Sequence, residues 1–202
     1  MTMQQMTPIL ILAAGAGTRM GGADKLALPV GGTPLLRDRA LAALSTGAPV
    51  HIALPAPGHP RAALVADLPV TLHHLPEAAL GQAHTLRAAV AALPPSDRFL
   101  VLLADLPEIT TADLRAVLDA PRHHPDALIW RGATARGEPG HPVLFDAALR
   151  PAFAGLTGDR GADSLIRAHK DRTVLVPLPG RHARRDLDTP ADWAAFRAET
   201  GL

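Results

Sequence analysis

Arg19 and Lys25 are the two cations of a glycine-rich segment, residues 12–25 (LAAGAGTRMGGADK), which follows a short aliphatic run. Glycine reaches positive φ at little cost, so the backbone N–H groups of such a segment can turn toward a bound anion. The two cations add the positive charge that a polyphosphate requires. The glycine-rich segment therefore predicts a phosphate-binding loop; the alternative is a flexible surface loop that binds nothing.

The glycine spacing differs from two familiar phosphate-binding motifs. A dinucleotide-binding fingerprint needs a third glycine at position 20, which is Met20 here. A P-loop needs Gly-Lys-Ser or Gly-Lys-Thr, whereas Gly22 is followed by Ala23. The spacing therefore disfavours a nicotinamide-dependent oxidoreductase and a P-loop enzyme.

Asp105 follows a hydrophobic run, residues 98–103, that reads as a buried strand. Ligands of open parallel sheets bind at the carboxyl ends of the strands, so Asp105 should lie beside the glycine-rich segment. A carboxylate at that place can hold Mg²⁺, which in turn bridges phosphate oxygens. The alternative is that Asp105 only caps a turn with Pro107.

A divalent ion needs a further carboxylate besides phosphates and water, and the candidates lie in residues 186–192 (DLDTPAD). The alternative for Asp188 is that it caps the helix that begins at Thr189 and Pro190.

These side chains must be positioned by regular elements, and the sequence predicts strands and helices that alternate along the chain. We expect strands over 8–12, 49–54, 70–75, 98–103, 126–130, 143–145 and 173–178, and helices over 34–45, 61–66, up to 93, 112–119, 146–153, 162–169 and 190–200. The first of these helices should be capped by Thr33. The pattern predicts an α/β fold with three layers, a Rossmann-like, mostly parallel sheet with helices on both faces. We expect one domain over residues 1–202, with a mobile loop near the site at 131–141.

Composition excludes several classes of protein. The 202 residues are 48% hydrophobic with a net charge of +1, which suits a folded core and gives no reason for a nucleic-acid partner. There is no cysteine, so disulfides and thiolate metal sites are absent. Because no apolar run approaches the length of a membrane span, we expect a cytoplasmic protein without a membrane partner.

Residues 12–36 resemble the signature of nucleotidyltransferases that transfer a nucleoside monophosphate from an NTP. The resemblance implies that the glycine-rich segment wraps the triphosphate, with Arg19, Lys25 and Asp105 as catalytic residues. It implies Mg²⁺ as the cofactor, held by Asp105 and by Asp188, the residue before Thr-Pro. The nucleotide-binding residues implied in this segment are Leu12, Ala13, Ala14, Gly15, Gly17, Thr18, Arg19, Gly21 and Lys25.

Two later motifs, GHPVLF (140–145) and GDRGA (158–162), resemble the molybdenum-cofactor cytidylyltransferase branch of these enzymes. The branch implies CTP as the nucleotide, molybdopterin as the acceptor and a molybdoenzyme as a further partner. It also implies that Gly81 and Thr85 lie near the nucleobase and ribose. His141 and Asp186 are the residues expected to face the acceptor.

One departure from the branch concerns charge. Asp163 stands where the branch usually has arginine, which weakens the assignment of the acceptor unless Arg160 or Arg167 substitutes for it. Two alternatives therefore stay open. One is a guanylyltransferase or another phosphate-acceptor nucleotidyltransferase of the same fold, and the other is a non-catalytic maturation factor that binds a nucleotide or pterin.

Overall fold

A computed structural model describes residues 6–15, 23–76, 81–157 and 161–202 of the chain. Its strands are β1 (Ile9–Leu12), β2 (Pro29–Val30), β3 (Thr33–Pro34), β4 (Val50–Leu54), β5 (Thr71–His74), β6 (Arg98–Leu103), β7 (Ile129–Ala133), β8 (Pro139–Asp146) and β9 (Thr173–Pro177). Its α-helices are α1 (Leu35–Leu44), α2 (Gln82–Ala91), α3 (Thr111–Asp119), α4 (Arg150–Ala154), α5 (Asp163–Ala168) and α6 (Pro190–Thr200). Short 3₁₀ turns include η2 (Lys25–Ala27) and η3 (Pro60–Val65). No helix in these ranges is long and apolar enough to cross a membrane.

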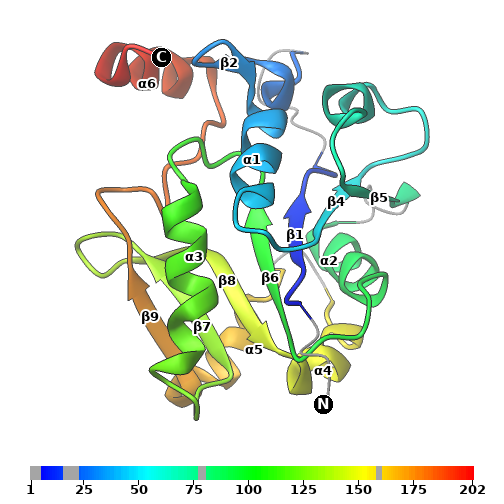
Figure 1. The fold of residues 1–202 in the computed structure, drawn as a ribbon, viewed down its shortest axis with the longest axis vertical. Coiled ribbons are helices and arrows are strands. Elements are labelled where there is room, and N and C mark those ends of the chain that lie inside the picture. The colour runs from blue at the N-terminus through cyan, green and yellow to red at the C-terminus, as the bar shows by residue number, and fades with distance from the viewer. Residues whose placement is uncertain (1–5, 16–22, 77–80, 158–160) are drawn as a thin grey trace.

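The main sheet has seven strands in the order β5-β4-β1-β6-β8-β7-β9. The strands β5, β4, β1 and β6 pair in parallel, as do β7 and β9, while β8 runs antiparallel to both of its neighbours. Figure 1 shows β1 and β6 side by side near the middle of the molecule, with their arrowheads toward the end where α6 and β2 lie. The mostly parallel α/β sheet expected from the sequence is confirmed.

Side chains that alternate along the strands build a separate core on each face of the sheet. Ile9 and Ile11 of β1 belong to the cluster that packs with α1, α3 and α6. Leu10 of the same strand belongs to the other cluster, with α2, α4 and α5. Because β1 is covered on both faces, it is aliphatic throughout, as buried parallel strands are. The three expected layers are therefore present.

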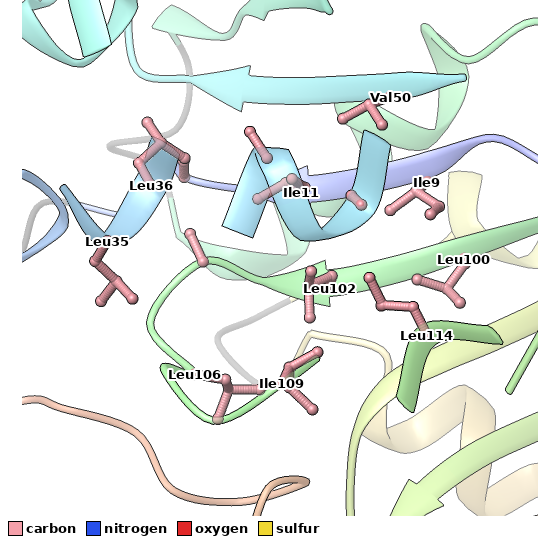
Figure 2. Packing of buried hydrophobic residues seen from close by; sticks show 14 of the residues in the cluster. Ile9, Ile11, Leu35, Leu36, Val50, Leu100, Leu102, Leu106, Ile109 and Leu114 are labelled. Atoms are coloured by element: carbon pink, nitrogen blue, oxygen red, sulfur yellow. The ribbon is translucent and has the colours of Figure 1, made fainter. Parts of the chain in front are cut away.

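The α1 side of the sheet carries the core drawn in Figure 2, where side chains of β1 and β6 gather with Leu35 and Leu36 of α1 and with Leu114 of α3. Leu106 and Ile109, in the connection after β6, belong to the same cluster and are 2% and 0% exposed. Burying such side chains contributes about 1.5–3 kcal/mol each. The connection that carries Asp105 is therefore anchored to the core.

Two local expectations were wrong. The mobile loop expected at residues 131–141 is a β-hairpin of β7 and β8, closed where the Thr134 N–H donates to Glu138 O over 2.9 Å and Gly137 takes a φ of 81°. Thr33 does not cap α1, because it pairs with Val30 in the small β2–β3 ribbon.

Candidate active site

The carboxyl ends of β1, β4 and β6 lie at one edge of the sheet. Beyond β1, the Ala13 N–H donates to Ala53 O over 3.0 Å, and the Ala104 N–H donates to Leu12 O over 3.2 Å. The start of the glycine-rich segment therefore lies beside the residue that precedes Asp105. This is the place where open parallel sheets bind ligands.

Lys25 joins both predicted acidic segments. Its Nζ lies 2.6 Å from Asp105 Oδ2 and 2.5 Å from Asp188 Oδ1, so one ammonium group bridges two carboxylates. The exposed fractions of the three side chains are 12% for Lys25, 22% for Asp105 and 28% for Asp188. The group is thus partly withdrawn from water yet reachable from it.

The surroundings of Lys25 keep it charged. Burial by itself lowers the pKa of a lysine, but the charges and hydrogen bonds of Asp105 and Asp188 outweigh burial and raise the pKa of Lys25 above its ordinary value. Lys25 is therefore a permanent cation at neutral pH.

Two hydrogen bonds hold the segment before α6 against the connection that carries Asp105. The Leu187 N–H donates to Asp105 O over 3.2 Å, and Leu187 itself is buried. Arg185 donates from Nη1 to Glu108 Oε1 over 3.0 Å, which ties this segment to the connection after β6. Asp188 thereby reaches Lys25 although it comes from the far end of the chain.

Thr189, and not Asp188, is the N-cap of α6. The Thr189 hydroxyl accepts from the Asp192 N–H, and Asp192 Oδ2 accepts from the Thr189 N–H, which together form a capping box. Since Thr189 satisfies the helix end, the side chain of Asp188 is directed to Lys25 instead.

The residues at this point suit a divalent cation. Asp105 Oδ1 is buried and has no hydrogen-bond partner among the described residues, so a further electropositive group would satisfy it. The ammonium of Lys25 shows that both carboxylates already converge on one positive charge. In the part of the chain that the structure describes, no group of three or more acidic, histidine or cysteine side chains is arranged to hold a metal ion by itself. An ion held by Asp105 and Asp188 would thus need phosphate oxygens and water as its other ligands.

His141 lies at the start of β8, near the end of β6. Its backbone N–H donates to Ala183 O over 2.8 Å. Its ring Nδ1 is buried and has no hydrogen-bond partner among the described residues. Burial, together with the charge of Arg131, lowers the pKa of His141 to about 4, although the charge of Asp105 acts in the opposite direction. A neutral imidazole at this place can donate one hydrogen bond to a ligand and accept another, but it carries no charge at pH 7.

The remaining predicted residues lie at the start of α2, in the segment before α6 and in the glycine-rich segment. Gly81 is the N-cap of α2, with φ 116°, and its carbonyl accepts from the Thr85 hydroxyl over 3.2 Å. Asp186 is exposed, next to the residues that contact Asp105. In the glycine-rich segment, Leu12, Ala13, Ala14, Gly15 and Lys25 are described, whereas Gly17, Thr18, Arg19 and Gly21 lie outside the described residues.

An ion pair beside Lys25, between Asp24 and the buried Arg61, was not predicted from the sequence. Asp24 accepts two hydrogen bonds from Arg61, at the start of η3, and Arg61 is 3% exposed. The signal available was weak: an arginine after the turn-forming residues that follow β4. The pairing depends on how η3 packs, which spacing along the chain does not reveal.

Comparison with known proteins finds a family model and relatives that match most of the chain. A family profile described as "MobA-like NTP transferase domain" matches residues 9–173. The nicotine blue oxidoreductase of Paenarthrobacter nicotinovorans is 30% identical over 189 residues, 89% of this chain and 91% of the relative. The purine catabolism protein PucB of Bacillus subtilis is 28% identical over 95% of this chain and 97% of the relative.

Solved structures share the fold. Rv0371c from Mycobacterium tuberculosis H37Rv has a TM-score of 0.80 at 24% identity, over 96% of this chain and 98% of that one. A structure of Rv0371C in complex with manganese has a TM-score of 0.77 at 24% identity and covers 95% of this chain and 97% of that one. A CMP-2-keto-3-deoxy-manno-octonic acid synthetase complexed with CTP has a TM-score of 0.76 at 15% identity and covers 96% of this chain and 98% of that one. At these identities the likeness shows the fold alone.

Proposed function

Because this chain belongs to the MobA-like NTP transferase family, we propose that it transfers CMP from CTP to the phosphate of molybdopterin and releases pyrophosphate. Nucleotidyl transfer is the activity of the family. The choice of CTP and of molybdopterin rests on the two motifs at 140–145 and 158–162, which resemble the cytidylyltransferase branch. A molybdoenzyme would then receive the product.

One observation carries the proposal: a single lysine of the glycine-rich segment meets two carboxylates at the carboxyl edge of the sheet. Lys25 Nζ lies within 2.6 Å of both Asp105 and Asp188. Phosphoryl chemistry on an NTP needs this combination, because positive charge must face the phosphates while carboxylates hold a divalent ion against them.

In the proposed reaction an oxygen of the acceptor phosphate attacks the α-phosphorus of CTP. The bond to the bridging oxygen of the β-phosphate breaks, and pyrophosphate leaves with the electron pair. The acceptor phosphate is already ionised at pH 7, so no general base is required. Catalysis then comes mainly from positioning and electrostatic stabilisation.

Each side chain has one task in this proposal. The backbone of the glycine-rich segment and Arg19 hold the β- and γ-phosphates, and Lys25 stabilises the α-phosphate. His141 orients the acceptor as a neutral hydrogen-bonding group, with Asp186 as a supporting residue. Gly81 and Thr85 lie at the N-terminus of α2, where they would contact the nucleoside.

Asp105 and Asp188 would hold Mg²⁺. When bound, the ion would offset the negative charge that gathers on the phosphate oxygens. The manganese complex of the structural relative Rv0371C supports a divalent ion without selecting magnesium.

A panel of the four NTPs tests the proposal. Each nucleotide is added with and without Mg²⁺, and the rise in melting temperature and the release of pyrophosphate with molybdopterin are measured. We expect CTP with Mg²⁺ to raise the melting temperature more than the other three NTPs do, and to be the nucleotide that releases pyrophosphate. Protection and turnover with GTP instead would favour the guanylyltransferase alternative, and protection without turnover on any acceptor would favour a non-catalytic binding protein.

An oxidoreductase is the second candidate because the relative in P. nicotinovorans carries that name. The glycine spacing of residues 15–22 departs from the dinucleotide-binding fingerprint, which argues against it. Oxidation of NADH or NADPH in the presence of nicotine blue can be followed by absorbance. Turnover in that assay, with no pyrophosphate released from any NTP, would replace nucleotidyl transfer as the function.

A further inference from the structure

Arg61 donates four hydrogen bonds to the two described ends of the glycine-rich segment. Its Nη1 donates to Ala13 O over 2.5 Å and to Gly15 O over 2.8 Å, just past the end of β1. Its Nε and Nη2 donate to the two carboxylate oxygens of Asp24, over 2.7 and 2.9 Å. One planar guanidinium thus joins residues 13–15 to the residue that precedes Lys25.

The burial of Arg61 makes this arrangement specific. A guanidinium that is 3% exposed is costly to bury unless its donors are satisfied, and here a carboxylate and two carbonyls satisfy them. The carbonyl of the buried Ala13 gains the partner that a buried backbone oxygen requires, and the carbonyl of the exposed Gly15 accepts from the same nitrogen.

Asp24 connects Arg61 to the turn that carries Lys25. Its Oδ1 accepts from the Leu26 N–H over 3.1 Å, which makes Asp24 the N-cap of the η2 turn that contains Lys25. Arg61 fixes Asp24, Asp24 fixes the first turn of η2, and Lys25 projects from that turn to Asp105 and Asp188.

The Arg61–Asp24 ion pair also sets the charge next to Lys25. Burial by itself raises the pKa of Asp24, but the hydrogen bonds and charge of Arg61 outweigh burial and keep that pKa below its ordinary value. Asp24 is therefore ionised beside a segment expected to bind a triphosphate. The charge of Arg61 compensates that carboxylate, so Asp24 adds no net negative charge beside Lys25.

We infer that Arg61 is a positioning residue for nucleotidyl transfer, acting through Asp24 and the carbonyls of Ala13 and Gly15 on the placement of Lys25. The inference rests on the proposed function. Arg61 touches neither the phosphates nor the metal in this account, and a lysine cannot replace it because a single ammonium cannot span a carboxylate and two carbonyls.

The test compares R61Q, R61K, D24N and the double variant D24N/R61Q with the wild type. We expect R61Q to lower kcat for pyrophosphate release at least tenfold, since small displacements of a catalytic group cost up to about 10²-fold. D24N should show a loss of the same order, and the double variant should be no more than about twofold worse than the poorer single variant, because both changes remove one interaction. R61K keeps the charge, and we expect it to stay impaired.

Arg37 offers a matched control. It donates to both carboxylate oxygens of Asp67 and to Leu64 O, the same kind of contacts as Arg61 makes, but at the surface. R37Q should keep kcat and the KM for the nucleotide within about twofold of the wild type. A lower melting temperature in R61Q with unchanged kcat and KM, measured where both proteins are folded, would show a purely structural role and overturn the inference.

A readout without turnover separates this inference from the proposed function. Amide hydrogen exchange at residues 24–28 should be at least tenfold faster in R61Q and D24N than in the wild type and R37Q, and equal rates would overturn the inference. A wild type that releases no pyrophosphate from any NTP contradicts the proposed function. An active wild type matched in kcat by R61Q contradicts the role of Arg61 alone.

Discussion

Lys25 Nζ lies 2.6 Å from Asp105 Oδ2, although the glycine-rich segment and the end of β6 are 80 residues apart in the chain. Asp188 shares the same ammonium. Two carboxylates that converge on one point repel each other unless a cation lies between them, and here the lysine is that cation. The arrangement links the nucleotide-binding segment directly to the proposed metal ligands.

Replacing Lys25 by methionine tests its role in turnover. The substitution shortens the side chain by only one atom and removes the charge, so both the stabilisation of the α-phosphate and the cation between the carboxylates are lost. We expect kcat for pyrophosphate release to fall about 10²–10³-fold, the scale for losing one preorganised electrostatic group.

Lys170 is the matched control for that variant. It lies in an exposed 3₁₀ turn before β9, so K170M should leave kcat unchanged. Near-normal turnover of K25M would show that the ammonium of Lys25 has no part in the reaction.

Asp105→Asn tests the proposed metal site. The amide is nearly the same size as the carboxylate but is a poor ligand for Mg²⁺, so we expect kcat to fall about 10²–10³-fold. The rise in melting temperature that Mg²⁺ and CTP produce together should also be lost, while D119N, at an exposed residue paired with Arg122, should retain it. Full magnesium-dependent protection of D105N would rule out Asp105 as a ligand.

Much of this fold could be predicted because its central strands carry an unambiguous pattern. β1 is aliphatic, β6 is hydrophobic from Phe99 to Leu103, and both are covered on both faces. The rule that ligands bind at the carboxyl ends of parallel strands then places Asp105 beside the glycine-rich segment. These two facts predict that Asp105 lies near the segment that carries Lys25, whereas the direct ion pair between them is seen only in the structure.

Strands were expected over 126–130 and 143–145, which overlap β7 and β8, but the hairpin that joins them at 131–141 was not predicted. Glycines stand there where other strands have apolar residues. A side chain at Gly132 would come within 2.8 Å of His141 O, and one at Gly140 within 2.0 Å of Ala183 O. The sequence shows only that apolar residues are scarce there, and the reason for the glycines is tertiary packing. The role of Arg61 was not predicted for a similar reason, since its partners Ala13, Gly15 and Asp24 lie 37 to 48 residues earlier in the chain.

Gly140→Ala tests that packing. The new Cβ would meet backbone atoms of Ala183, which cannot move without shifting the segment that leads to Asp188. We expect the free energy of unfolding to fall by about 1–3 kcal/mol, as for other overpacked sites. Urea denaturation measures the change.

Gly155→Ala is the comparison for that variant. Gly155 has a φ of −90°, and a Cβ there would meet only Ala152 O at 3.7 Å, an ordinary contact. G155A should therefore change the free energy of unfolding by less than about 0.5 kcal/mol. Equal losses in the two variants would mean that the close approach at Gly140 does not govern stability.

Acid should destabilise the protein through its histidines before its carboxylates titrate. Burial lowers the pKa of His141 to about 4 from an ordinary value of 6.5, and burial also lowers the pKa of His51 and His73, whose rings stack. The unfolded chain takes up these protons first, so stability is complete above about pH 6.5 and is lost as the pH falls toward 4. For His141 the loss between pH 7.5 and 5 is about 2 kcal/mol.

Urea denaturation at a series of pH values checks this, with the pH dependence of the free energy of unfolding as the quantity compared. His141→Gln should flatten that dependence by about 2 kcal/mol between pH 7.5 and 5, whatever its effect on stability at pH 7.5. His123→Gln, at an exposed residue after α3, should leave the dependence as in the wild type. Carboxylates such as Asp24 and Asp192 have an ordinary pKa of 3.8 that is lowered further in the fold, so they act at lower pH and do not mask the result. An unchanged slope in H141Q would show that His141 can be protonated in the folded protein, and the neutral role proposed for it at the acceptor would have to be abandoned.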